Sequence, residues 1–188
     1  MNKYSNKPSF AFGAQIIMNQ GIEIKPTIRH FYAVECYDSK GVLKWKDGFE
    51  NLVTTAGLNW YLDAALKTGV ASPLFSIGLK GTGGAVVGDA MNSHANWTEI
   101  YTEYSNGTRP PWTPGAVASG TVDNSASKAG FNITSAATVW GAFMVGVTGH
   151  GTVKNGANGT LLGAGDFTTY RIVQNGDTLN ITVTCTMS

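Results

Sequence analysis

A strict two-residue alternation near the C-terminus constrains the fold more than any other feature of this sequence. Apolar side chains occupy every second position from Leu179 to Met187, and threonine or asparagine fills the positions between them. Successive side chains of a β-strand point to opposite faces, so this period predicts a strand with one buried face and one threonine-rich outer face.

A turn signal stands directly before this strand. Residues 169–174 form another strand-like run, and Asn175-Gly176 links the two. Both central residues of a type I′ turn need positive φ, which Asn and Gly tolerate best. The sequence therefore predicts a β-hairpin made of residues 169–174 and 178–187.

A second hairpin is expected over residues 28–50. Side chains alternate from Arg29 to Cys36, residues 38–41 (Asp-Ser-Lys-Gly) have turn composition, and Val42 begins the returning strand. Further strand-like runs cover residues 75–79, 99–104, 117–122, 129–134 and 138–147. Roughly eight to ten short strands separated by frequent turns predict an all-β, two-sheet β-sandwich of the jelly-roll or Ig-like kind. The run 138–147 is apolar on both faces, so we expect it to be central and covered on both sides.

One short α-helix is predicted near residues 55–67. Apolar residues follow a helical spacing there, at Leu58, Tyr61, Leu62, Ala65 and Leu66. Thr54 or Thr55 can cap its first turn, and Gly69 lies where a left-handed residue would end it. We expect the apolar stripe to pack against a sheet.

The chain divides into two parts. Residues 28–188 are assigned to the sandwich domain, which includes the hairpin 28–50 and the helix, and residues 1–27 to an extended N-terminal arm. The arm is too short to fold alone. It would order on a neighbouring molecule by burying Phe10 and Phe12, the alternative being an ordinary flexible terminus.

Composition excludes several functions. Charged residues make up only 13% of the chain and the net charge is +1, with no cluster of Lys or Arg, so no nucleic-acid partner is expected. No apolar run approaches the roughly 18 residues that span a bilayer, and no secretory signal is visible, so no membrane partner is expected. Cys36 and Cys185 are expected to be free, buried thiols.

Catalytic chemistry is not indicated. The histidines are His30, His94 and His150, and none belongs to a recognisable nucleophile, acid-base or zinc motif. Glu99 and Glu103 are a weak carboxylate pair, because residues four apart splay along a strand. We expect no enzyme activity, no metal and no cofactor.

An aromatic group surrounds the proline-containing loop 106–115. It consists of Trp97, Tyr101, Tyr104 and Trp112, together with Arg109. Trp, Tyr and Arg dominate the energetics of protein interfaces, so these five residues, with Phe10 and Phe12, are candidate partner-binding residues. A hydrophobic cluster that pins the loop and a carbohydrate-binding platform are the alternatives.

A family resemblance adds to this interpretation. The segment Asn51–Asp63, with the sequence NLVTTAGLNWYLD, resembles a pattern of small structural proteins of tailed bacteriophages, in which a β-hairpin leads into a helix. Shorter stretches, such as 94–99, 109–114, 124–128 and 176–180, are also similar, so the resemblance covers roughly residues 30–188. The family motif carries no catalytic residues.

The resemblance implies a protein of the virion. We expect a capsid decoration (cement) protein that is assembled in the bacterial host cytoplasm, lies on the capsid surface and stabilises the shell. Its partners would be the major capsid protein, or a tail protein, and further copies of itself in a dimer or trimer. The alternative is a tail or head-fibre component that contacts host-surface glycans.

Overall fold

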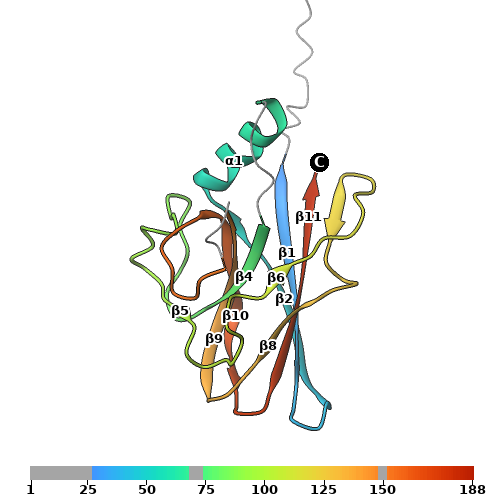
Figure 1. Cartoon of the computed structure of the whole chain (residues 1–188), viewed down its shortest axis with the longest axis vertical. Coiled ribbons are helices and arrows are strands. Elements are labelled where there is room, and N and C mark those ends of the chain that lie inside the picture. The colour runs from blue at the N-terminus through green and yellow to red at the C-terminus, as the bar shows by residue number, and fades with distance from the viewer. Residues whose placement is uncertain (1–26, 68–73, 148–151) are drawn as a thin grey trace, which may run out of the picture.

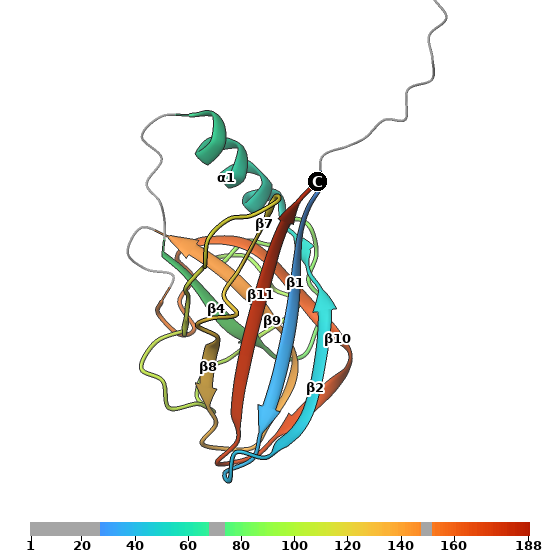
Figure 2. The ribbon, with the colours of Figure 1, turned by 90° about the vertical axis from the view of Figure 1, so that its right-hand side faces the viewer.

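The computed structural model describes residues 27–67, 74–147 and 152–188. Within these ranges two antiparallel sheets face each other, and a single helix, α1 (Thr55–Leu66), stands at one end of them (Figures 1 and 2). The predicted all-β, two-sheet sandwich with one short helix is confirmed.

The first sheet contains both ends of the described chain. Its order is β2 (Leu43–Glu50), β1 (Ile28–Tyr37), β11 (Thr178–Met187) and β7 (Thr121–Asp123), with β8 (Ala129–Asn132) also paired to β11. The second sheet has the order β3 (Leu52–Val53), β10 (Thr160–Val173), β9 (Ala137–Val147), β4 (Leu74–Lys80) and β5 (Glu99–Ile100), and β6 (Pro111–Trp112) pairs with β4.

The hairpin predicted over residues 28–50 is confirmed. Strands β1 and β2 pair from Tyr37 with Leu43 to Phe31 with Glu50. The Asp38 carboxylate closes the turn by accepting hydrogen bonds from the backbone N–H groups of Lys40 and Val42, both at 2.9 Å.

The hairpin predicted around Asn175-Gly176 is wrong. A turn is present, with φ of +87° at Gly176, but β10 and β11 belong to different sheets and do not pair. The chain instead crosses from one sheet to the other. The buried Asp177 carboxylate holds this corner by accepting from Gln174 N at 2.8 Å and Lys44 Nζ at 2.6 Å.

Two further strand predictions were too long. The run 99–104 forms a strand only over Glu99–Ile100, and the run 117–122 is interrupted by a turn before β7. Ser119 and Gly120 have φ of 49° and 71°, and Ala118 and Thr121 exchange both backbone hydrogen bonds across them. Positive φ at both central residues is the mark of a type I′ turn, which the sequence analysis missed.

Strand β9 is central and is covered on both faces, as predicted. Ala142 and Met144 belong to the main hydrophobic cluster between the sheets. Phe143 and Val145 belong to a second cluster on the other face, where Met91 and Trp97 cover them. The loop before β5 therefore acts as a third layer over the second sheet.

The arm predicted for residues 1–27 lies outside the described residues except for Thr27. Thr27 and Ser188 exchange two backbone hydrogen bonds, N to O, of 2.7 and 3.1 Å. The ladder between β1 and β11 therefore continues to the end of the chain.

Candidate interaction surface

Helix α1 is anchored to the sandwich by its first turn. Thr54 is the N-cap: its Oγ1 accepts from Gly57 N at 3.0 Å and donates to the carbonyl of Leu161 on β10. The N–H of Thr54 donates to the carbonyl of Leu162 at 3.1 Å. The predicted cap is confirmed. The same hydroxyl group bonds to the first turn of α1 and to strand β10.

Close backbone contact completes this anchor. Gly57 is the only buried residue of α1, and a Cβ at this position would lie 2.8 Å from Leu162 Cα. Any larger residue would push the helix away from β10. The helix ends at Leu66, with Lys67 as its C-cap in an extended conformation, and Gly69, the predicted C-terminal residue, lies outside the described residues.

Two aromatic side chains form the rest of the inner face of α1. Trp60 packs edge-on against Phe75, with ring centroids 5.3 Å apart. The Tyr61 hydroxyl lies 2.8 Å from Nε2 of His30, which is fully buried. The other ring nitrogen of His30, Nδ1, lies 3.1 Å from Asn51 Nδ2, so the ring is held between an amide and a phenol hydroxyl.

The leucine stripe of α1 does not pack against a sheet, contrary to the prediction. Leu58, Leu62 and Leu66 are 40%, 58% and 79% exposed. Gly57, Trp60 and Tyr61 provide the contacts to the sandwich, so the row of leucines, spaced four residues apart, turns outward. A spacing that predicts an amphipathic helix does not specify which side of the helix meets the core.

These leucines line an apolar groove with the open ends of β1 and β11. We call it the apolar end surface, and it encloses about 340 Å³. It is lined by Ile28, Leu58, Tyr61, Leu62, Ala65, Leu66 and Met187. A neighbouring apolar hollow of about 240 Å³ shares Ile28, Tyr61 and Met187 with it and adds Val117, Val122 and Cys185.

The apolar end surface continues the inner face of β11. Leu179, Ile181 and Val183 are fully buried, but farther along the same face Met187 is 54% exposed. Ile28 pairs with Met187, and α1 stands at this same end of the sandwich, beside the C-terminus (Figures 1 and 2). The sandwich thus leaves part of its apolar face open at one end.

Groups that could carry charge beneath this surface are held neutral. Burial lowers the pKa of His30 to about 4 and raises the pKa of Cys185 to about 12. Burial also raises the pKa of Tyr61 well above its usual value. Around neutral pH these three groups are uncharged, which suits a surface that binds apolar side chains. Both cysteines are free as predicted, Cys36 buried and Cys185 half-buried.

The predicted partner-binding residues lie mostly in the interior. Trp97, Tyr104, Arg109 and Trp112 are at most 8% exposed, and only Tyr101 is half-exposed. Phe10 and Phe12 lie outside the described residues. The four buried side chains leave no surface for a partner, and they fit the alternative, packing that pins the loop.

Hydrogen bonds satisfy the polar groups of the two buried tryptophans. Trp97 Nε1 donates to Asp89 Oδ2 at 2.9 Å, and Trp112 Nε1 donates to the carbonyl of Val183 at 3.1 Å. A carbohydrate platform at Trp112 is excluded because its ring faces β11 and the core.

Arg109 and Glu99 form a buried, two-pronged ion pair. Arg109 Nε and Nη2 donate to Glu99 Oε1 and Oε2 at 2.9 and 2.7 Å. Asn155 N donates to Oε2 at 2.9 Å, and Arg109 Nη2 also reaches the carbonyl of Gly156 at 3.1 Å. This pair therefore joins two loops over β9.

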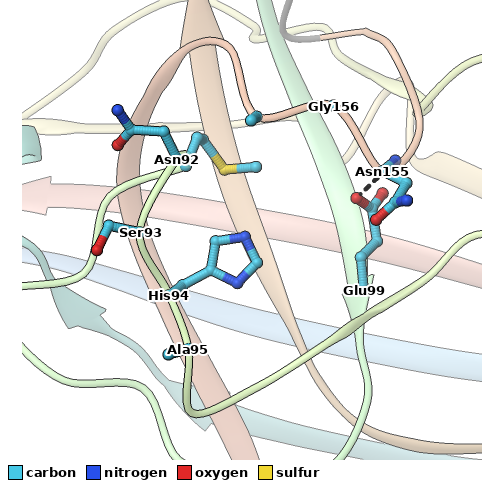
Figure 3. A pocket seen from close by; sticks show the side chains of 9 residues that line it. Asn92, Ser93, His94, Ala95, Glu99, Asn155 and Gly156 are labelled. Atoms are coloured by element: carbon cyan, nitrogen blue, oxygen red, sulfur yellow. Dashed lines mark hydrogen bonds between the residues drawn. The ribbon is translucent and has the colours of Figure 1, made fainter.

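A polar hollow of about 460 Å³ lies beside this ion pair (Figure 3). His94 points into it, while Glu99 and Asn155 meet at its far side. The His94 ring stacks on Trp97 with centroids 4.0 Å apart, and its Nδ1 lies 3.2 Å from the Trp97 carbonyl. Both Glu99 oxygens are occupied by donors, so Glu99 is not available as a base for His94.

Among the described residues, no three His, Cys, Asp or Glu side chains gather as a metal site would require. None of the helices described is long and apolar enough to cross a membrane.

Comparisons of the chain with protein-family models, with curated proteins and with solved structures give no match. The candidate site therefore depends on the geometry above and on the sequence.

Proposed function

We propose that this chain is a non-catalytic structural protein of a tailed-phage particle, a capsid decoration protein that binds the shell lattice and other copies of itself. The observation that carries the proposal is the apolar end surface, where three leucines of α1 stand exposed on a helix that is firmly anchored. Exposed apolar patches on an otherwise well-packed domain mark binding sites.

The family-like segment supports the same proposal. Within residues 51–63, Thr54 and Gly57 anchor α1, while Leu58 and Leu62 contribute to the apolar end surface. The part of the sequence that resembles phage structural proteins is thus the part that builds the candidate binding site. A decoration protein needs a rigid body with a binding surface, and the exposed apolar groove at one end of the sandwich supports that role.

Binding to shells that lack this chain tests the proposal. We expect saturable, stoichiometric binding of the purified protein, and at least a tenfold loss of affinity in the double variant Leu62→Gln and Leu66→Gln, because two apolar contacts of about 1 kcal/mol or more would be removed. Leu43→Gln is the matched control: Leu43 is 50% exposed, but it lies on β2 beside the turn at the opposite end of the sandwich (Figure 2).

Absence of saturable binding by the wild-type protein would refute a decoration role. Equal binding by the double variant and the Leu43 control would show that the shell contacts another surface.

A tail or head-fibre protein that contacts glycans is the second candidate, and a different aromatic pair favours it. Trp140 and Tyr170, on β9 and β10, lie with ring centroids 5.3 Å apart, and Tyr170 is 48% exposed. Exposed rings can stack on sugars. Glycan-array binding that is lost in Tyr170→Ala but kept in Leu62→Gln would favour this candidate over the decoration protein.

A further inference from the structure

We infer that the apolar end surface is a receptor for the N-terminal segment of a second copy of this chain, with Ile16, Ile17 and Met18 as the inserted side chains. The inference rests on the proposed function, since it names the partner through which copies associate. The segment, residues 10–24, precedes the described residues.

The groove and the segment match in chemistry. The groove is lined by apolar side chains and by Tyr61, whose hydroxyl is turned to His30. The segment 10–24 is rich in apolar residues, including Phe10, Phe12 and the consecutive Ile16, Ile17 and Met18. A short peptide of this kind gains binding energy by placing such side chains in an apolar groove.

The described part of the chain begins beside the groove. Ile28, the first residue of β1, lines the groove, and Thr27 is tied to Ser188 by two backbone hydrogen bonds. About ten residues separate Ile17 from Thr27, a length that reaches up to roughly 33 Å when extended. That reach is enough to enter a neighbouring molecule that stands against this end of the sandwich.

The sequence next to Thr27 favours a neighbour over the chain's own groove. Pro26 restricts Lys25 to extended conformations. Residues Ile22 to Lys25 alternate apolar and charged side chains, as a strand does. This alternation predicts an extended continuation of β1, and for that reason we assign the receiving groove to a neighbouring copy.

Reciprocal exchange follows from this placement. The origin of the segment and the groove that receives it lie at the same end of the molecule. Two copies related by a two-fold axis at that end can each pass a segment to the other, which is the self-complementary arrangement of a symmetric dimer.

Isotope-resolved photo-crosslinking of the full chain tests this inference. Ile17 is replaced by the photo-reactive p-benzoylphenylalanine in unlabelled protein, which is mixed with an excess of ¹⁵N-labelled wild-type protein and irradiated. We expect cross-links to the peptide 55–67 of the labelled copy. We also expect Ile17→Asp and Leu62→Gln each to weaken self-association at least tenfold in sedimentation, with Leu43→Gln as the unaffected control.

Several results of these experiments would overturn the inference. Cross-links to unlabelled peptides of the same chain alone would mean that the segment covers its own groove. Cross-links only to residues outside 55–67 would exclude the exchange. The exchange would also be excluded if sedimentation at a series of protein concentrations finds only monomer. Shell binding by a monomeric protein would refute the exchange and leave the decoration role intact. Cross-linked dimers that do not bind shells would support the exchange and refute the decoration role.

Discussion

His30 is the residue whose burial has the clearest measurable consequence. It lies on β1, where its ring nitrogens are 3.1 Å from Asn51 Nδ2 and 2.8 Å from the Tyr61 hydroxyl on α1. Burial lowers its pKa to about 4 from an ordinary value of 6.5. The unfolded chain therefore binds a proton between these values that the folded chain does not bind.

The first prediction is a loss of stability in mild acid. Stability conferred by a neutral His30 is fully present above pH 6.5 and is lost as the pH falls toward 4. We expect the free energy of unfolding to fall by about 2 kcal/mol from pH 7 to pH 5 through this group. Urea unfolding at a series of pH values measures it.

The matched comparison uses two histidine variants. His30→Gln should flatten this pH dependence, whereas His94→Gln, which alters a half-exposed ring outside the network, should retain it. Identical pH profiles for wild type and His30→Gln would contradict the assignment.

The second prediction concerns the buried pair of Arg109 and Glu99. Replacing Arg109 with Met leaves the Glu99 carboxylate buried without its counter-ion, so we expect a loss of about 3–5 kcal/mol of folding stability. The double variant Arg109→Met with Glu99→Gln removes the stranded charge and should recover at least about 1 kcal/mol. Chemical denaturation checks both.

An interface role for Arg109 would give a different result. A residue that serves only a partner changes folding stability by less than about 0.5 kcal/mol when it is substituted. Such a small effect for Arg109→Met would restore the sequence-based interpretation of Arg109 as a contact residue.

At the scale of elements, the attachment of α1 decides whether the leucine stripe is presented. Thr54 caps the helix and also bonds to the carbonyl of Leu161 on β10, so Thr54→Ala removes both interactions. The third prediction is a loss of about 1–2 kcal/mol, together with faster amide hydrogen exchange throughout α1. The neighbouring variant Thr55→Ala, at an exposed position, is the control and should change neither quantity.

The sequence predicted the elements better than it predicted their partners. Alternation identified β1 and β11, because a period of two depends only on which face of a strand is buried, and a run that is apolar on both faces identified β9. The turn signal at Asn175-Gly176 marked a real turn, yet the outgoing strand joins the other sheet. Turn composition describes local φ values, whereas the choice of sheet depends on β1 and β9, which lie far away in the sequence.

At the candidate site, too, the sequence predicted the element but not which of its residues face the core. The spacing of Leu58, Leu62 and Leu66 predicted an amphipathic helix correctly, but the small residue Gly57 and the two aromatics beside it take the inner face. Likewise, residue type alone singled out Trp112 and Arg109 as contact residues, although each has a specific buried hydrogen-bond partner. The exposure of Ile28 and Met187 could not be read from sequence, because it depends on where the opposite sheet stops.

At the scale of the whole molecule, the two sheets and the covering loop form a well-packed body with an exposed apolar groove at one end. The fourth prediction is that this end contributes to association and not to folding. The double variant Leu62→Gln and Leu66→Gln should unfold within about 0.5 kcal/mol of wild type, because both side chains are mostly exposed.

Thermal unfolding of that double variant at low protein concentration provides the measurement. A loss above about 2 kcal/mol, as large-to-small changes in a core produce, would mean that the leucines pack inside the folded molecule. The apolar end surface would then be an internal feature and not a binding site.

A cryo-EM map of the complete particle tests the central claim most directly. We predict density for the sandwich on the shell, oriented so that the α1 end, with Leu62 and Met187, is buried in a contact with another protein copy. A map that shows this end facing solvent, with the particle contact made elsewhere or with the chain missing from the particle, would contradict it.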